Sequence, residues 1–151
     1  MRPLSRRAAL ALGAASAAFT VLGTGGSALA APKDAADDIA KFTGGKAAEQ
    51  GKISIELPEI AENGNTVPIA VSVESPMTEA DHVTDVLVVA DGNPRPGVAT
   101  YHFTALSGKA EASTRIRLAT TQNIVVVAKT STGKIYTAQK LVKVTIGGCG
   151  G

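Results

Sequence analysis

The sequence predicts an all-β protein, and three observations lead to that fold class. From residue 52 onward apolar residues recur with a period of two, the period at which side chains return to one face of a strand. These apolar residues are largely valine and isoleucine, which fit a pleated sheet, whereas the chain has three Phe, two Tyr and no Trp. Turn residues divide the alternating segments at roughly eight to twelve residues, as in a β-sandwich. We therefore expect a sandwich with an aliphatic core.

A short helix is expected ahead of the first strand, within a polar, alanine-rich lead over residues 31–50. Asp34 is predicted to be its N-cap, because a short acidic side chain can accept a hydrogen bond from a free helical N–H group. Ile39 and Phe42 stand at helical spacing and would turn one apolar face toward the domain. Gly44-Gly45 is expected to end the helix.

Seven strands are expected after this lead. They are predicted over 53–57, 67–73, 82–90, 98–106, 112–118, 123–130 and 134–146, with turns at 62–65, 91–94, 107–109 and 131–133. Val86–Val89 and Ile124–Val127 are apolar on both faces and are candidates for central strands. Residues 93–97 contain two prolines, which cannot donate to a sheet, so they should form a loop at the rim. The whole pattern is typical of an immunoglobulin-like β-sandwich of about seven strands.

The first thirty residues are predicted to be an export signal rather than part of the fold. Arg6 and Arg7 belong to a positively charged start, and residues 8–21 are apolar. Ala28 and Ala30 form a small-x-small cleavage site, which places the cut after Ala30. The apolar stretch is short for a spanning helix and is interrupted by polar residues, so no membrane anchor is predicted. The expected divisions are a signal over 1–30, a helical lead over 31–50, a sandwich over 51–146 and an arm over 147–151.

The paired arginines resemble a twin-arginine export signal, although Ala9 stands where that pattern often has phenylalanine. An ordinary secretory signal is the alternative, and both routes lead out of the cytoplasm. Removal of the signal takes away three arginines and leaves 12 Lys and Arg against 13 Asp and Glu, a net charge of −1. The mature chain therefore has no basic footprint that would indicate a nucleic-acid partner.

Cys149 is the only cysteine, and it stands between Gly147-Gly148 and Gly150-Gly151. A single cysteine excludes an internal disulfide and a resolving thiol, which argues against a disulfide oxidoreductase. The four glycines remove side-chain packing around the thiol and allow wide backbone freedom. Five extended residues would span roughly 17 Å. We expect a flexible arm that carries one exposed thiol.

Other residues give little sign of an active site. His82 and His102 are the only histidines and lack metal-ligand spacing. His102 is expected to be a structural or surface residue within a strand, and His82 to stand where a strand begins. The Asp37-Asp38 pair, like Arg115 with Arg117, should be solvated. A mobile thiol with no neighbouring base favours a carrier, because the chemistry would then come from other proteins.

The segment Val142–Gly151, with its Gly-Gly-Cys-Gly-Gly end, closely resembles the tail of the SoxY family, the sulfur-carrier subunits of the thiosulfate-oxidising Sox pathway. Residues 93–103 and the twin-arginine-like start are also similar to that family, so the resemblance spans essentially the whole chain. It implies an immunoglobulin-like fold, a periplasmic location and a heterodimer with SoxZ, a second sandwich protein. Twin-arginine export carries folded proteins, so a partner without a signal could travel with this chain.

The same resemblance implies that Cys149 is the site of covalent substrate attachment and that Gly147, Gly148, Gly150 and Gly151 form a swinging arm. A c-type cytochrome complex (SoxAX-like) would couple thiosulfate to the cysteine as an S-thiosulfonate, and a dimanganese hydrolase (SoxB-like) would release sulfate. A molybdenum–haem sulfur dehydrogenase (SoxCD-like), where present, would oxidise the remaining sulfane sulfur. The chain itself would be no enzyme and would hold no metal or cofactor, only the sulfur intermediates.

Three alternatives stay open at this point. Cys149 could form a terminal disulfide in a structural homodimer. A ubiquitin-like sulfur donor also ends in Gly-Gly, but its chemistry needs ATP, to which an exported protein has no access. An enzyme could use Cys149 as its nucleophile, although the sequence shows neither an adjacent base nor a rigid element to hold the thiol.

Overall fold

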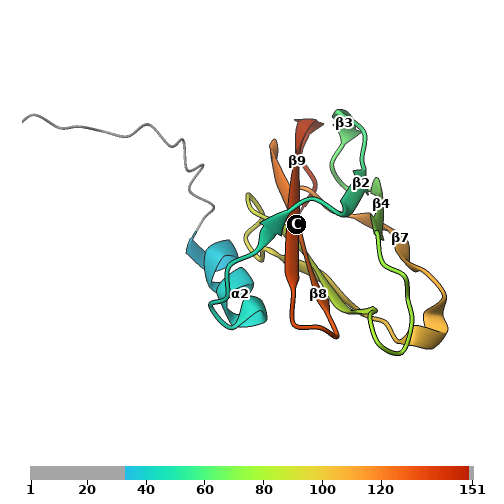
Figure 1. Cartoon of the computed structure of the whole chain (residues 1–151). Coiled ribbons are helices and arrows are strands. Elements are labelled where there is room, and N and C mark those ends of the chain that lie inside the picture. Colours follow the sequence, from blue (N-terminus) through green and yellow to red (C-terminus); the bar gives the residue numbers. More distant parts are fainter. Residues whose placement is uncertain (1–32, 150–151) are drawn as a thin grey trace, which may run out of the picture.

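The computed structural model describes residues 33–149, which form two packed β-sheets with one helix on the outside (Figure 1). This arrangement confirms the immunoglobulin-like sandwich and the short N-terminal helix. The predictions for Arg6, Arg7, Ala28, Ala30, Gly150 and Gly151 lie outside the described residues. Within the described part, no helix is long and apolar enough to cross a membrane.

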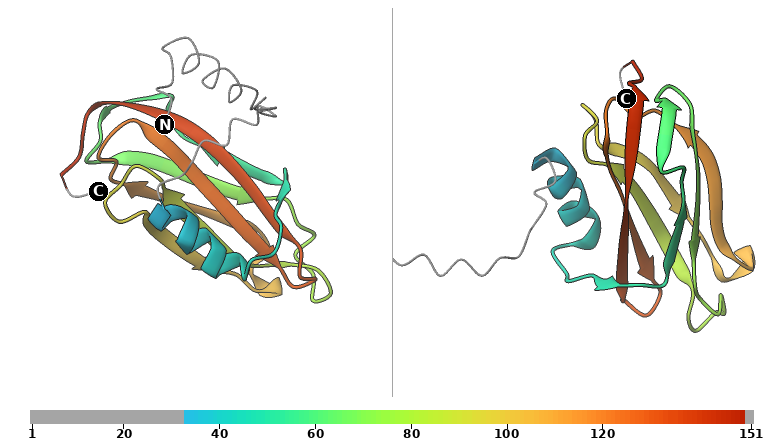
Figure 2. Two further views of the ribbon diagram at one scale, coloured as in Figure 1. Left: turned by 90° about the vertical axis from the view of Figure 1, so that its left-hand side faces the viewer. Right: turned by 90° about the horizontal axis from the view of Figure 1, so that it is seen from above.

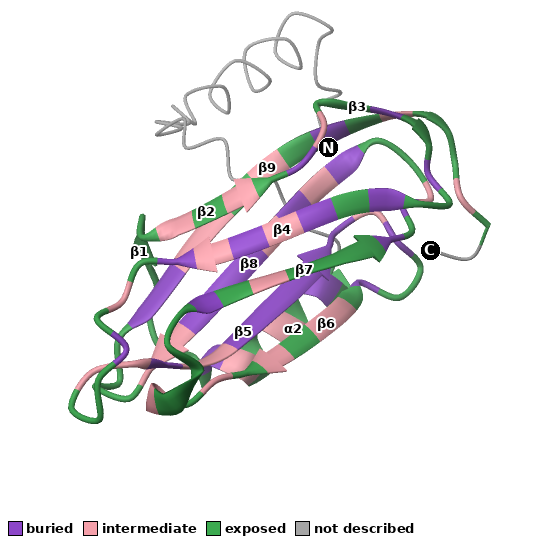
Figure 3. Ribbon diagram, turned by 90° about the vertical axis from the view of Figure 1, so that its right-hand side faces the viewer, coloured by how far each residue is buried: buried purple, intermediate pink, exposed green. Residues whose placement is uncertain are grey.

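The two sheets differ in size. The larger sheet contains β1 (Glu49–Gln50), β3 (Ile60–Asn63), β5 (Val83–Ala90), β6 (Gly97–His102), β8 (Gln122–Thr130) and β9 (Ile135–Ile146). Its order is β1-β9-β8-β5-β6, and β3 also pairs with β9. The smaller sheet has the order β2-β4-β7 and contains β2 (Ile53–Glu56), β4 (Val67–Val73) and β7 (Ala110–Ile116). Figure 3 shows buried residues alternating with less buried ones along β4, whereas β5 is buried over most of its length.

The two strands that were predicted to be central, β5 and β8, both lie inside the larger sheet. β8 lies between β9 and β5, and β5 lies between β8 and β6. On β5 the side chains of Val86 and Val88 face the core between the sheets, whereas Leu87 and Val89 belong to a second buried cluster. A strand that is covered on both faces has a continuous apolar run in its sequence, and this run predicted that β5 is central.

Helix α2 (Lys33–Thr43) supplies the cover for that second face (Figure 2). Its Ile39 and Phe42 pack against the buried cluster of Ala35, Leu87 and Val89, as their helical spacing predicted. The N-cap prediction was wrong: Asp34 lies inside the first turn, where a carboxylate is stabilised by the helix dipole.

Gly44 and Gly45 end helix α2, as expected, in a left-handed conformation with φ values of 63° and 76°. The Gly45 N–H donates to the Ala40 carbonyl over 3.2 Å, the closing bond of a glycine-terminated helix.

The structure has two strands more than the seven predicted, and both lie on one edge of β9. β1 pairs in parallel with its start, where Glu49 stands opposite Tyr136, and β3 pairs in parallel with its end, where Asn63 stands opposite Ile146. Between them the chain crosses to the smaller sheet as β2. These strands have two and four residues, too few for a period of two to stand out. The turn predicted over 62–65 is consequently shorter, because Glu62 and Asn63 belong to β3.

The strand predicted over 98–106 was too long at its end. β6 stops at His102, and Ala105–Ser107 form a 3₁₀ turn. The Thr104 N–H donates to Ser107 Oγ over 3.1 Å and the Ser107 N–H donates to the Thr104 carbonyl over 2.9 Å. Local side-chain bonds of this kind compete with sheet pairing.

The core is aliphatic, as predicted. Its largest fully buried side chains are those of Leu118, Ile124, Val67, Val83, Val86, Val88, Val89, Val126, Val127 and Val142. We expect Ile124→Ala, at 0% exposure, to lower the free energy of unfolding by about 2–5 kcal/mol through lost burial and a residual cavity. Urea unfolding measures this.

The matched control is Ile60→Ala, where the same side chain is 59% exposed and the expected loss stays within about 0.5 kcal/mol. Equal losses at the two positions would contradict the assignment of the core.

Candidate functional site

The exposed thiol of Cys149 lies three residues beyond the end of β9, at one end of the sandwich. β9 pairs with β8 over residues 135–142 and with β3 at its end, so the strand places the last residues at a fixed position. Figure 2 shows this end of the chain beside β3. Cys149 is a free cysteine, as the sequence requires.

Gly147 and Gly148 pack against the backbone of a neighbouring segment. The Gly148 N–H donates to the Leu118 carbonyl over 2.8 Å. A Cβ atom added to Gly147 would lie 2.2 Å from the Ala119 carbonyl oxygen, and one added to Gly148 would lie 2.6 Å from the Gly64 carbonyl oxygen. The two glycines therefore permit a close backbone approach, and the flexibility predicted for them stays a prediction.

Gly64 lies between the end of β9 and this segment. Its N–H donates to the Ile146 carbonyl over 2.7 Å, and its carbonyl accepts from the Leu118 N–H over 2.8 Å. A Cβ atom at this position would lie 2.2 Å from the Leu118 carbonyl oxygen. The sequence marked Gly64 only as part of a turn, because nothing local in the chain shows which distant backbone will approach it.

Asn65 contacts the residue that carries the thiol. Its Oδ1 accepts a hydrogen bond from the Cys149 N–H over 3.1 Å. The Asn65 N–H in turn donates to Asn63 Oδ1 over 2.9 Å, an Asx turn that fixes the start of the loop. Both asparagines belong to the turn predicted over 62–65, and nothing in the sequence indicated their part at the site.

A buried asparagine, Asn93, supports the opposite side of the site. Its Nδ2 donates to the Arg117 carbonyl over 2.8 Å, and its Oδ1 accepts from the Ala119 N–H over 2.9 Å. Gln122 Nε2 donates to the same Oδ1 over 2.9 Å. Asn93 is 8% exposed, so these bonds form in a protected environment and fix residues 117–119. The sequence predicted only a rim loop at this position.

The other candidate residues are not brought together with Cys149 by any contact in the described part of the chain. His102 lies on β6 and pairs with Asp85 over 2.6 Å, with its side chain 76% exposed. His82 precedes β5, and its Nδ1 lies 2.9 Å from the Thr78 carbonyl. His102 is a surface residue and His82 stands just ahead of a strand, as expected. Among residues 33–149, no group of three or more His, Cys, Asp or Glu could hold a metal ion.

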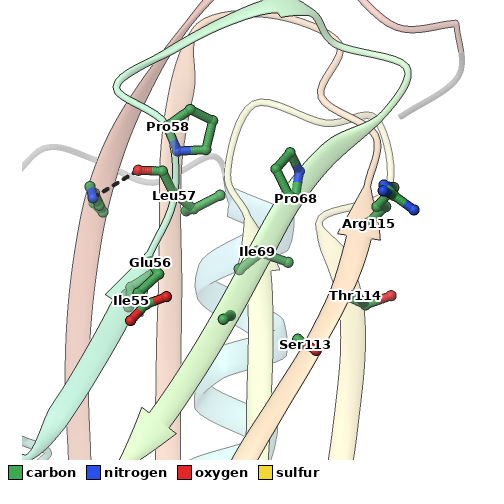
Figure 4. A pocket seen from close by; sticks show the side chains of 11 residues that line it. Ile55, Glu56, Leu57, Pro58, Pro68, Ile69, Ser113, Thr114 and Arg115 are labelled. Atoms are coloured by element: carbon green, nitrogen blue, oxygen red, sulfur yellow. Dashed lines mark hydrogen bonds between the residues drawn. The ribbon is translucent and has the colours of Figure 1, made fainter.

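An open groove of about 1160 Å³ lies across β2, β4 and β7 (Figure 4). Leu57, Pro58 and Pro68 line one end of it, and the Lys140 ammonium donates to the Leu57 carbonyl over 2.9 Å. Cys149 is not among its lining residues. The groove and the thiol are therefore separate features of the molecule.

Most of the described chain matches a known protein family. A family model for "Sulfur oxidation protein SoxY" matches residues 39–149. The solved structure of the sulfur carrier protein SoxY from Chlorobium limicola f thiosulfatophilum is similar, with a TM-score of 0.62 and 37% sequence identity. That match covers 74% of this chain and 96% of the other. No curated protein matches.

Superoxide reductases share the fold at lower identity. The T24K variant of the Ignicoccus hospitalis enzyme has a TM-score of 0.56 and 19% identity, over 69% of this chain and 90% of that one. The Nanoarchaeum equitans enzyme has a TM-score of 0.54 and 12% identity, over 64% and 100%. At these identities the likeness shows the fold alone.

We expect Asn93→Ala to lower the free energy of unfolding by about 2–3 kcal/mol, because it leaves buried donors and acceptors without partners. Amide exchange at Ala119 should accelerate with it. His102→Ala, which removes an exposed pair, should cost less than about 1 kcal/mol. Denaturant unfolding compares the two variants, and an equal cost would show that Asn93 does not support the site.

Proposed function

Because this chain belongs to the SoxY family, we propose that it is a sulfur carrier that holds its substrate covalently on Cys149 Sγ. One observation supports this assignment more than any other. The single thiol of the chain is exposed, lies beyond the end of a firmly paired strand, and is flanked by residues without side chains. A group attached there meets no steric barrier from its neighbours and stays accessible to large partners.

The carrier chemistry proceeds in steps that other proteins catalyse. Thiosulfate couples through its sulfane sulfur to Cys149, which forms an S–S bond and releases one thiol proton and two electrons; a c-type cytochrome complex accepts the electrons. Water then cleaves the bond between the outer sulfur and the sulfonate group, which leaves as sulfate. A persulfide remains on Cys149, and a sulfur dehydrogenase, where present, oxidises it further.

The surroundings of Cys149 favour a carrier over an enzyme. The one hydrogen bond that this residue makes in the described part of the chain joins its backbone N–H to Asn65 Oδ1. A nucleophile in an enzyme is activated by a base within hydrogen-bond reach and held by a rigid element. Cys149 instead follows two glycines on an exposed end, so partner enzymes supply the activation.

The cellular setting follows from the same proposal. The N-terminal signal directs the chain to the periplasm, by the twin-arginine route, and the sandwich domain forms a heterodimer with a SoxZ-like subunit. SoxAX-like, SoxB-like and SoxCD-like enzymes bind transiently. The chain holds no metal or cofactor of its own.

Mass spectrometry of the tryptic peptide Val144–Gly151 tests covalent attachment directly. Protein isolated from cells grown on thiosulfate should carry an S-thiosulfonate or sulfane adduct on Cys149. The adduct should disappear on treatment with a thiol reductant, because it is held by an S–S bond. An unmodified thiol under every growth condition would contradict the proposal.

Cys149→Ser separates the carrier from a disulfide-linked structural dimer. We expect thiosulfate oxidation to fall to the level measured without the protein, because a hydroxyl cannot form the S–S bond. Thr145→Ser, at an exposed position on β9, is the matched control and should keep full turnover. Non-reducing electrophoresis gives the dimer content. A variant that loses the dimer yet oxidises thiosulfate normally would rule out the carrier.

A further inference from the structure

We propose that the arm has a docking site on its own domain, formed by the Gly64-Asn65 turn and residues 117–119, and that Asn65 is a positioning residue for the thiol. We call this site the dock. The inference deepens the proposed function, on which it rests only for the choice of Cys149 Sγ as the reacting atom.

Three backbone hydrogen bonds define the dock. The Gly64 N–H donates to the Ile146 carbonyl over 2.7 Å, and the Leu118 N–H donates to the Gly64 carbonyl over 2.8 Å. The Gly148 N–H then donates to the Leu118 carbonyl over 2.8 Å. The three bonds join the end of β9, the 64–65 turn and the 117–119 segment in a closed ring. Such a ring fixes the arm at both residue 146 and residue 148.

The glycines of the dock allow neighbouring backbone segments to approach closely. Each added Cβ atom, at Gly64, Gly147 or Gly148, would come within 2.2–2.6 Å of a backbone oxygen, which cannot move aside as a flexible side chain could. None of the three has a φ in the left-handed range, so their backbone conformation alone does not require glycine. Flexibility can explain glycines at 147 and 148, but it does not explain Gly64, which is buried and distant in sequence.

Asn65 extends the dock to the thiol-bearing residue. Its Oδ1 accepts from the Cys149 N–H over 3.1 Å, and the Asx turn with Asn63 orders its own backbone. Because this last bond is exposed to water, its net contribution is modest and the residue can leave. The arm therefore has a docked state, which holds the thiol at the end of the sandwich, and a released state, which reaches farther.

The experiment uses the mature chain without sulfur substrate, in wild-type form and as Asn65→Ala, Gly64→Ala and Thr66→Ala. Thr66 is the matched control: a neutral, exposed neighbour in the same turn. Amide hydrogen exchange at Gly148 and Cys149 is measured by NMR, together with the rate of Cys149 alkylation by iodoacetamide and the melting temperature.

We expect the wild-type Gly148 amide to be protected from exchange. Asn65→Ala should raise the exchange rate of the Cys149 amide by about two- to tenfold, with an unchanged melting temperature and a smaller effect at Gly148. Gly64→Ala should release both amides, and Thr66→Ala should change neither.

An unprotected Gly148 amide in the wild type, or an Asn65→Ala variant that exchanges like Thr66→Ala, would overturn the dock. Asn65→Ala keeps the test valid if Gly64→Ala fails to fold. Since no sulfur substrate is present, the result is independent of whether Cys149 is modified in cells, so the dock and the carrier proposal can fail separately.

Discussion

The pairing of β9 on both of its edges is the constraint on which the rest of the structure depends. β8 bonds to one edge over most of its length, and two short parallel strands, β1 and β3, share the other. This arrangement orders the larger sheet, closes the sandwich against β2 and ends with the last paired residue, Ile146. Everything that follows Ile146 starts from a position that the sheet has fixed.

The packing of the domain is separate from the contacts of its carboxy-terminal end. The buried core lies between the sheets, and a second cluster lies under helix α2, so neither depends on the residues after β9. The bonds that reach Gly148 and Cys149 are few and partly exposed. Their loss costs the domain little, whereas their presence gives the thiol a preferred place. For the proposed carrier role both properties matter. The thiol must be held when no partner enzyme is bound and released when one binds.

The sequence was sufficient for the features that depend on local periodicity. Alternation in β4 and the apolar runs of β5 and β8 predicted these strands correctly, and the Gly44-Gly45 pair indicated the end of helix α2. β3 was missed because four residues with a single buried member carry no period.

The site was predictable only at its centre. A single cysteine among glycines can be recognised from the sequence as a candidate site, and the resemblance to a family indicated its chemistry. Gly64, Asn65 and Asn93 lie far from Cys149 in the sequence, and each bonds to a backbone group of another segment, whose position depends on the finished fold. An asparagine in a turn or in a proline-rich loop has an ordinary local reason to be there. The sequence alone does not distinguish an asparagine that only forms a turn from one that also bonds to a distant backbone group.

The aliphatic core has a consequence for how motion in this protein can be observed. The chain has no tryptophan, so its intrinsic fluorescence comes from two tyrosines, Tyr101 on β6 and Tyr136 on β9. Both report on the larger sheet, and Tyr136, 5% exposed with the Lys52 ammonium 5.2 Å from its ring centroid, reports on the start of the strand rather than its end. Tyrosine fluorescence therefore follows unfolding of the domain and does not report on the carboxy-terminal residues. A tryptophan or a thiol-reactive dye would be needed to make those residues visible to light.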